Sequence, residues 1–192
     1  SKKLSKYGFE AKNKLKSMNA VNKLYLTSKK FKKRGVKKVG DMLYPLGVLS
    51  DTRNFAKNRK IIQVQFSLPL INQGKAKELV DFLINNQKPI LCSVKRINGS
   101  QKDLNFSFLQ NGWTFAIDIT YENINRKSLN EFYNKLIQYG GKIYLAKDAT
   151  LNEDLFKKMY SNYEKWEEVV REIDPNNFFQ SELSKRLGLK QW

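Results

Sequence analysis

The sequence predicts an α+β fold of the ferredoxin-like kind, in which a β-α-β-β-α-β order forms an antiparallel sheet with both helices on one face. Residues 61–68 and 113–121 alternate apolar and polar side chains, as half-buried strands do. Two apolar stripes of helical spacing, each bounded by Gly, Asn or Pro, lie between the predicted strands. With 192 residues, of which 41% are hydrophobic, the chain can bury one substantial core.

The first strand and the first helix are separated by Pro69. The strand places four residues on its apolar face, namely Ile62, Val64, Phe66 and Leu68. Asn85, Asn86 and Pro89 close the helix that follows. Its apolar stripe consists of Ala76, Leu79, Val80 and Leu83.

The second half of the sheet repeats this order. A strand is expected at 90–97 and another at 113–121, joined by a polar loop. Ser128 and Glu131 have the spacing of a capping box at a helix start, and Gly140 and Gly141 end that helix. Its buried stripe is Leu129, Phe132, Tyr133 and Leu136, and a fourth strand follows at 142–146.

The C-terminal tail predicts two short helices rather than one long one. Thr150 with Glu153, and Ser161 with Glu164, have the spacing of two further capping boxes. The second helix should bury a stripe formed by Trp166, Val169, Val170 and Ile173. It should end at Asp174 and Pro175, and Ser181 can cap a last turn that reaches Leu187.

The net charge of +18 is concentrated at the start of the chain. Residues 1–40 hold fourteen Lys or Arg and one acid, Glu10, and carry apolar residues at helical spacing. We therefore expect three parts: a basic helical arm at 1–40, a connecting loop at 41–60 and a folded domain at 61–192. The arm predicts peripheral contact with anionic lipid or a phosphate-bearing substrate, and a solvated helix face is the alternative. The chain begins at Ser1 rather than Met, so we expect it to be part of a longer protein.

Composition excludes several classes of site. Cys92 is the single cysteine and there is no His, so a disulfide framework and the usual zinc sites lack their residues. Cys92 lies on the apolar face of its predicted strand, and we expect it to be a small buried residue. Any acid or base in this chain must be Lys, Tyr, Asp or Glu. No run approaches the ~20 apolar residues of a membrane span. We expect a cytoplasmic location, with peripheral contact at the inner membrane through the arm.

The sheet face opposite the predicted helices is rich in hydrogen-bonding groups. If the apolar faces lie under the helices, the other face carries a polar set. This set is Gln63, Gln65, Ser93, Lys95, Thr114, Ala116, Asp118 and Tyr144, with Lys147 just beyond. Such a face can simply meet water. The mixture of amide, ammonium and phenol groups favours a surface that binds a polar ligand.

Several segments resemble one enzyme family. They are IIQVQFSLP at 61–69, SVK at 93–95, GWTFAID at 112–118, GGKIYLAKD at 140–148, WEEVVREIDP at 166–175 and SELSKRL at 181–187. Together they resemble the C-terminal half of the decaprenylphosphoryl-β-D-ribose 2′-oxidase family. This family belongs to the vanillyl-alcohol-oxidase type of FAD enzymes, alongside the sugar-1,4-lactone oxidases. The resemblance covers most of residues 41–189.

The resemblance implies an FAD-dependent oxidoreductase that oxidises a sugar hydroxyl by hydride transfer to flavin. In the family an N-terminal domain, absent from this chain, holds FAD, and the C-terminal sheet faces the flavin ring and the substrate. The substrate is then a polyprenyl-phosphate-linked sugar or a sugar lactone. Lys147 and Tyr144 become the catalytic candidates, with Lys147 at the pyrimidine edge of the ring. The predicted binding residues are Gln63, Gln65, Lys95, Thr114, Ala116 and Asp118.

Three positions depart from the family pattern. Where the family has Asn and Cys, this chain has Thr114 and Ala116, so inhibitors that bond to that cysteine should not react here. Where the family has an aromatic residue, this chain has Ile97, which changes the wall of the substrate pocket.

Two other functions fit the same pattern. An RNA-binding module of the RRM type shares the element order and the positive charge, but it needs exposed aromatics on its central strands. This sequence has Gln63, Gln65, Thr114 and Ala116 there, so nucleic-acid binding is disfavoured. The other alternative is a non-catalytic domain that serves in assembly or membrane attachment.

Overall fold

The structure is a computed structural model that describes residues 27, 36, 38, 39, 60–99 and 104–189. The chain divides into two units, Ser1–Lys57 and Asn58–Trp192, and the helices and strands given below lie in the second. The predicted basic arm and connecting loop lie almost entirely outside the described residues, and their functions stay predictions.

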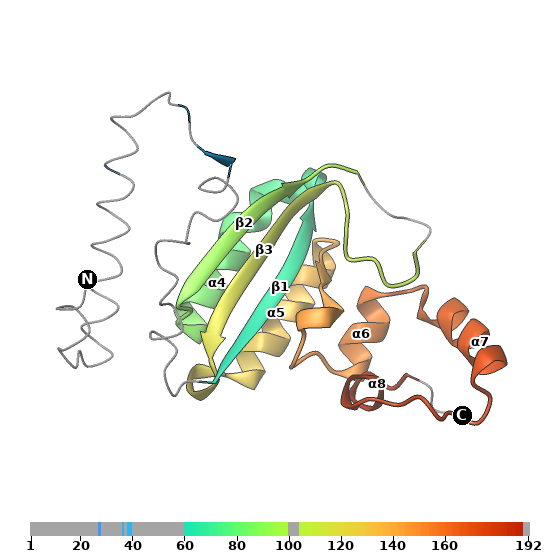
Figure 1. Cartoon of the computed structure of the whole chain (residues 1–192). Coiled ribbons are helices and arrows are strands. Elements are labelled where there is room, and N and C mark those ends of the chain that lie inside the picture. The colour runs from blue at the N-terminus through green and yellow to red at the C-terminus, as the bar shows by residue number, and fades with distance from the viewer. Residues whose placement is uncertain (1–26, 28–35, 37, 40–59, 100–103, 190–192) are drawn as a thin grey trace. The chain divides into compact units, whose positions relative to one another are not determined.

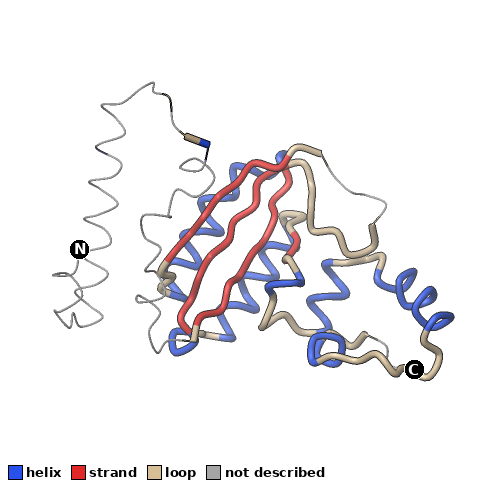
Figure 2. The backbone as a smooth tube through the Cα atoms, in the orientation of Figure 1, coloured by secondary structure: helices blue, strands red, loops and turns tan. Residues whose placement is uncertain are grey.

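A four-stranded antiparallel sheet forms the centre of this unit. Its strands are β1 (Ile61–Pro69), β2 (Leu91–Ile97), β3 (Gly112–Thr120) and β4 (Lys142–Ile143). They are arranged in the order β2-β3-β1-β4, so the first and third strands of the chain are central. This is the ferredoxin-like arrangement, and the predicted fold class is confirmed (Figures 1 and 2).

Two long helices cover one face of the sheet, and shorter helices follow it. The long helices are α4 (Ala76–Gln87) and α5 (Arg126–Gln138), which lie on the same side of the strands in Figure 1. The tail contains α6 (Glu153–Met159), α7 (Tyr163–Ile173) and α8 (Glu182–Arg186). Short 3₁₀ turns occur at Leu70–Lys75, Tyr121–Asn123 and Leu145–Lys147.

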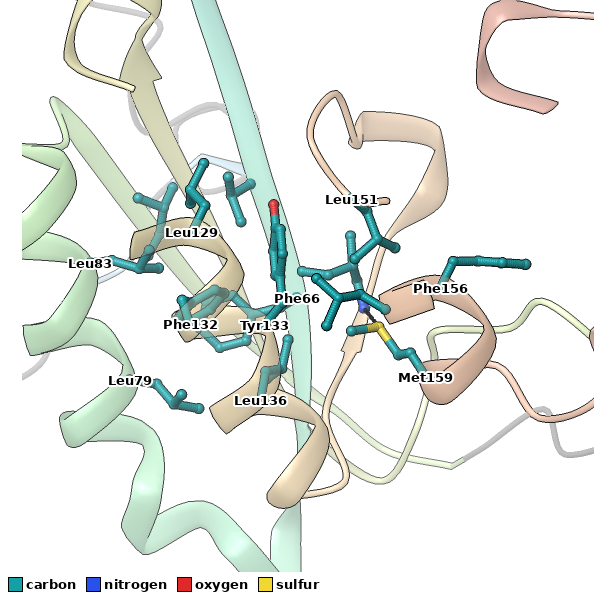
Figure 3. Packing of buried hydrophobic residues seen from close by; sticks show 14 of the residues in the cluster. Phe66, Leu79, Leu83, Leu129, Phe132, Tyr133, Leu136, Leu151, Phe156 and Met159 are labelled. Carbon is teal, nitrogen blue, oxygen red and sulfur yellow. Dashed lines mark hydrogen bonds between the residues drawn. The ribbon is translucent and has the colours of Figure 1, made fainter. Parts of the chain in front are cut away.

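The core lies between the sheet and these two helices, with Phe66 at its centre. The Phe66 ring stacks on Phe115 at 4.9 Å between centroids and meets Phe132 edge-on at 5.2 Å. Figure 3 shows the side chains of α4 and α5 on one side of Phe66 and those of the tail on the other. The predicted stripe of α5, Leu129, Phe132, Tyr133 and Leu136, is fully buried.

The tail attaches to the sheet through β4. The backbone N–H of Ile143 donates to Met159 Sδ at 3.0 Å, an interaction visible in Figure 3, and the Tyr160 hydroxyl donates to the carbonyl of Ile143. After Ile143 the chain leaves the sheet, so β4 is shorter than the predicted strand at 142–146. The Tyr144 N–H still donates to the Gln65 carbonyl at 2.8 Å, and a 3₁₀ turn then carries the chain to Lys147.

The three capping boxes predicted with Glu residues are wrong, because asparagines mark the helix starts. Asn125 caps α5 by accepting from the Ser128 N–H at 3.1 Å, and Asn152 caps α6 by accepting from the Leu155 N–H at 2.9 Å. Asn caps a helix as well as Ser or Thr does. The residue before α7 is Asn162 and makes no side-chain cap. The cap predicted at Ser181 is confirmed, with Ser184 as its partner.

Two burial predictions are also wrong. None of the described residues of α7 is buried, and Val169 and Ile173 of the predicted stripe are 52% and 76% exposed. Cys92, expected in the core, is exposed because β2 is an edge strand. Partial desolvation of the thiol, and then the charge of the nearby Asp118, raise its pKa and favour the neutral form, which is a poor nucleophile.

Among the described helices, none combines the length and the apolar character that crossing a bilayer requires.

Candidate functional site

The sheet face turned away from the core carries the predicted polar set. Because Val64, Phe66, Phe115 and Ile117 point into the core, their neighbours along β1 and β3 point to the opposite face, which we call the open face. The strand register pairs Gln63 with Asp118 and Gln65 with Ala116. It also pairs Ser93 with Ala116 and Lys95 with Thr114. The chain therefore brings these residues into one polar surface.

Three of the predicted site residues form a continuous hydrogen-bonded chain on the open face. Lys147 Nζ donates to Gln63 Oε1 at 2.5 Å, and Gln63 Nε2 donates to Asp118 Oδ1 at 2.5 Å. Lys147 is exposed, whereas Gln63 and Asp118 are half-buried. The ammonium group is therefore held in place at the surface and keeps access to a ligand.

Gln65 and Thr114 make a second, separate contact. Gln65 Nε2 donates to Thr114 Oγ1 at 3.3 Å, and that hydroxyl donates to the Phe66 carbonyl at 3.0 Å. Thr114 is only 5% exposed. Its hydroxyl is therefore better suited to orienting Gln65 than to contacting a ligand directly.

One end of the open face is closed by the loop at 104–111. The Phe108 ring stacks on Tyr144 at 4.4 Å between centroids, with an interplanar angle of 28°. Ser67 Oγ donates to the Phe108 carbonyl at 2.6 Å, and Gln110 Nε2 donates to Ser67 Oγ at 2.9 Å. Lys142 Nζ adds a contact to the Ser107 carbonyl at 3.4 Å, and burial lowers the pKa of this lysine. Tyr144 is thus half-buried and its ring is fixed by Phe108.

Sequence reasoning missed Phe108 and Ser67. Ser67 could have been found, because strand alternation places it on the same face as Gln63 and Gln65. Phe108 lies in the segment predicted as a loop, and its alternation with Leu104 and Phe106 does not indicate that its ring meets Tyr144.

Lys95 and Ala116 complete the open face without joining these networks. Lys95 is exposed on the edge strand β2, and Ala116 is half-buried on the central strand β3. Ala116 is paired with Gln65 on one side and Ser93 on the other, and its methyl group extends less far from the sheet than the Gln65 side chain does. Lys95 can reach an anionic group from the side.

Within the described residues, the open face lacks the features of an RNA-binding module and of a metal site. On the central strands β1 and β3 its residues are polar or small, so the exposed aromatics of an RNA-binding module are missing from these strands. Within 60–99, 104–189 and the four isolated residues described, no group of three or more His, Cys, Asp or Glu could hold a metal ion.

A hollow elsewhere on the molecule is unsuited to a phosphate-bearing ligand. It is lined by Glu164, Glu167, Glu168, Arg171 and Glu172. Four carboxylates against one guanidinium repel an anion. The open face, with Lys147 and Lys95, has the more favourable charge.

Comparisons with known proteins support the resemblance. Residues 99–187 match the family model described as "D-arabinono-1,4-lactone oxidase". Over 154 residues the chain is 22% identical to decaprenylphosphoryl-beta-D-ribose oxidase from Mycolicibacterium smegmatis. The aligned region covers 80% of this chain and 34% of that protein. The chain is also 29% identical over 84 residues to an uncharacterized protein in the mprA 5′ region of Streptomyces coelicolor, covering 43% of this chain and 23% of that protein.

These matches confirm that the chain is similar to FAD-linked oxidases. The chain spans about a third of the first relative and about a quarter of the second. The matched family region contains Thr114, Ala116, Asp118, Tyr144 and Lys147, whereas Gln63, Gln65 and Lys95 precede it.

Proposed function

We propose that this chain supplies the substrate-facing sheet of an FAD-dependent oxidoreductase that oxidises a secondary hydroxyl of a sugar. The FAD would be held mainly by an N-terminal flavin-binding domain that is not part of this sequence. The observation that carries the proposal is the Lys147 ammonium, hydrogen-bonded to Gln63 and exposed on the open face of a chain similar to FAD-linked oxidases.

The residues of the open face have the chemistry to bind one edge of a flavin ring. When bound, the flavin would accept a hydride from the substrate and carry negative charge on its reduced ring. Lys147 is placed to stabilise that charge, since a fixed cation beside a developing anion lowers the barrier to its formation. Gln63 holds the ammonium in position and offers no competing charge.

The remaining open-face residues suit the substrate. Gln65 presents an amide that Thr114 orients, and Tyr144 presents a phenol whose ring Phe108 fixes. Both groups can bind sugar hydroxyls. Lys95, exposed at the edge, suits the phosphate of a polyprenyl-phosphate-linked sugar. A sugar lactone would engage the same amide and phenol groups but would leave Lys95 without an anionic partner.

The test replaces Lys147 in the complete flavoprotein and measures the rate of flavin reduction by substrate. Lys147→Ala should slow this rate roughly a hundredfold or more, by analogy with the loss of one charge-stabilising group in other enzymes. Lys147→Arg should recover part of the rate because it keeps the cation. Lys158→Ala, which removes an exposed lysine on α6, is the matched control and should reduce flavin at the normal rate.

Normal flavin reduction in the Lys147→Ala variant would overturn the role given to this lysine. The absence of any flavin-binding polypeptide encoded with the chain would overturn the proposed function as a whole.

A further inference from the structure

The Lys147, Gln63 and Asp118 side chains come from three adjacent parts of the sheet. Gln63 lies on the central strand β1, Asp118 lies opposite it on β3, and Lys147 follows β4 on the other side of β1. Gln63 is thus the only one of the three that neighbours both others, and it joins them through its two amide atoms.

The chemistry of the two neighbours fixes the orientation of the Gln63 amide. A glutamine amide has an oxygen that accepts and an NH₂ that donates, and these two ends are hard to tell apart by shape alone. The Asp118 carboxylate can only accept, so it takes the NH₂ end, at 2.5 Å. The Lys147 ammonium can only donate, so it takes the oxygen, also at 2.5 Å. In a flipped amide the oxygen would face the Asp118 carboxylate, so that two acceptors meet, and the NH₂ would face the Lys147 ammonium, so that two donors meet.

We propose that Asp118 is a positioning residue that acts on Lys147 through Gln63. The proposal rests on the function proposed above and refines it, because Asp118 then holds the site together instead of binding the ligand. Asp118 holds the amide NH₂, and the amide oxygen then faces Lys147. Without Asp118 the terminal torsion of Gln63 has a broad energy well, and its oxygen no longer has a fixed direction.

This arrangement leaves the ammonium ordered and available. A lysine side chain has a flexible four-carbon stem, so an exposed ammonium normally samples many positions. Lys147 uses one of its three N–H donors on Gln63, which leaves two for a ligand. Opposite charges at the two ends of the amide also align with its dipole, which strengthens both hydrogen bonds.

The direct test measures the order of the Lys147 side chain by ¹⁵N relaxation of its Nζ group, using the 192-residue chain without flavin. Asp118→Ala should lower the order parameter of Lys147 Nζ and of Gln63 Nε2, although among the described residues the Asp118 carboxylate is hydrogen-bonded to Gln63 and not to Lys147. Asp118→Asn should restore the order, because the Asn Oδ1 can still accept from Gln63. Asp81→Ala is the matched control, since that carboxylate pairs with Lys77 on α4, and it should leave Lys147 unchanged.

A double-mutant cycle separates an indirect effect from a direct one. In a Gln63→Ala background, Asp118→Ala should have no further effect on Lys147, because the connecting amide is already gone. A remaining effect in that background, or an unchanged Lys147 in the single Asp118→Ala variant, would overturn the proposal. If Asp118→Ala fails to fold, Asp118→Leu tests the inference in its place, because leucine has a similar shape but offers no acceptor to the Gln63 amide.

An activity measurement then distinguishes this inference from the proposed function. In the complete flavoprotein Asp118→Ala should slow flavin reduction roughly tenfold, since a displaced catalytic group loses rate steeply with distance. If Lys147→Ala slows reduction but Asp118→Ala leaves Lys147 ordered, the positioning role fails and the function stands. If Asp118→Ala disorders Lys147 while Lys147→Ala reduces flavin normally, the positioning role stands and the function fails.

Discussion

Helices α5 and α7 have similar amphipathic patterns in the sequence, but their apolar stripes are buried to different extents. Each shows an apolar stripe of four residues at helical spacing. In α5 all four residues of the stripe are fully buried in a core that also contains residues of the sheet, α4 and the tail. In α7 none of the described residues is buried, and Ile173 is 76% exposed.

The contacts of the two helices explain the difference. The side chains of α5 meet the aromatic rings of the sheet, such as Phe132 against Phe66 at 5.2 Å. Two aromatic contacts of α7 lie in its first turns, where Trp166 meets Phe106 at 5.0 Å and Tyr163 meets Phe156 at 6.0 Å. Beyond α7, Asp174 is only 5% exposed and its two carboxylate oxygens accept from the Phe178 and Phe179 N–H groups at 2.8 and 3.0 Å. Hydrophobic periodicity therefore predicts a helix and its apolar face, but it does not predict what covers that face.

The largest effect is expected from truncating the stripe of α5. Phe132→Ala should lower the free energy of unfolding by about 3–5 kcal/mol, because it removes a fully buried ring and leaves a cavity beside Phe66. The measurement is chemical denaturation of the 192-residue chain. Ile84→Ala, at an apolar α4 residue that is 48% exposed, is the control and should cost much less. A loss below about 1 kcal/mol for Phe132→Ala would contradict the burial of α5.

The features that could be predicted were those that follow from the side-chain period of a strand or a helix. The alternation in β1 and β3 gave the open face correctly, because the side-chain period of a strand is two. The stripe of α5 was also predicted correctly, whereas the same periodicity in α7 did not predict burial, because burial depends on what packs against the helix. The helix starts were predicted wrongly because a nearby asparagine is an equally good cap. Asn125 caps α5 in place of Ser128, and Asn152 caps α6 in place of Thr150.

The candidate site could be predicted as a set of residues but not as a network. The strand pattern placed Gln63 and Asp118 on one face, and only the register showed that they are direct neighbours. The contact with Lys147 depends on the 3₁₀ turn that replaces the end of the predicted fourth strand. The ring of Phe108 against Tyr144 depends on the path of a loop, which follows from packing rather than from local sequence.

A smaller effect is expected where the end of α7 is held by polar contacts. Asp174→Ala removes the acceptor of two backbone N–H groups and should cost about 1–3 kcal/mol of local stability. Hydrogen exchange should show faster exchange of the Phe178 and Phe179 amides, with the amides of α5 unchanged. Asp174→Asn, which keeps one acceptor oxygen, should lie between the wild type and Asp174→Ala. Equal exchange in all three proteins would show that the carboxylate does not hold this turn.

The smallest effect is expected on the stripe of α7 itself. Ile173→Ser replaces an apolar side chain that is already 76% exposed, so the free energy of unfolding should change by no more than about 0.5 kcal/mol. Leu136→Ser is the matched variant in α5, where the same loss of apolar surface occurs at a fully buried position, and it should be strongly destabilising. Denaturation of the two variants side by side compares the helices directly. A loss of more than about 1 kcal/mol in the free energy of unfolding of Ile173→Ser would show that the Ile173 side chain is buried in solution. In that case α7 would be buried as α5 is, but against a different partner.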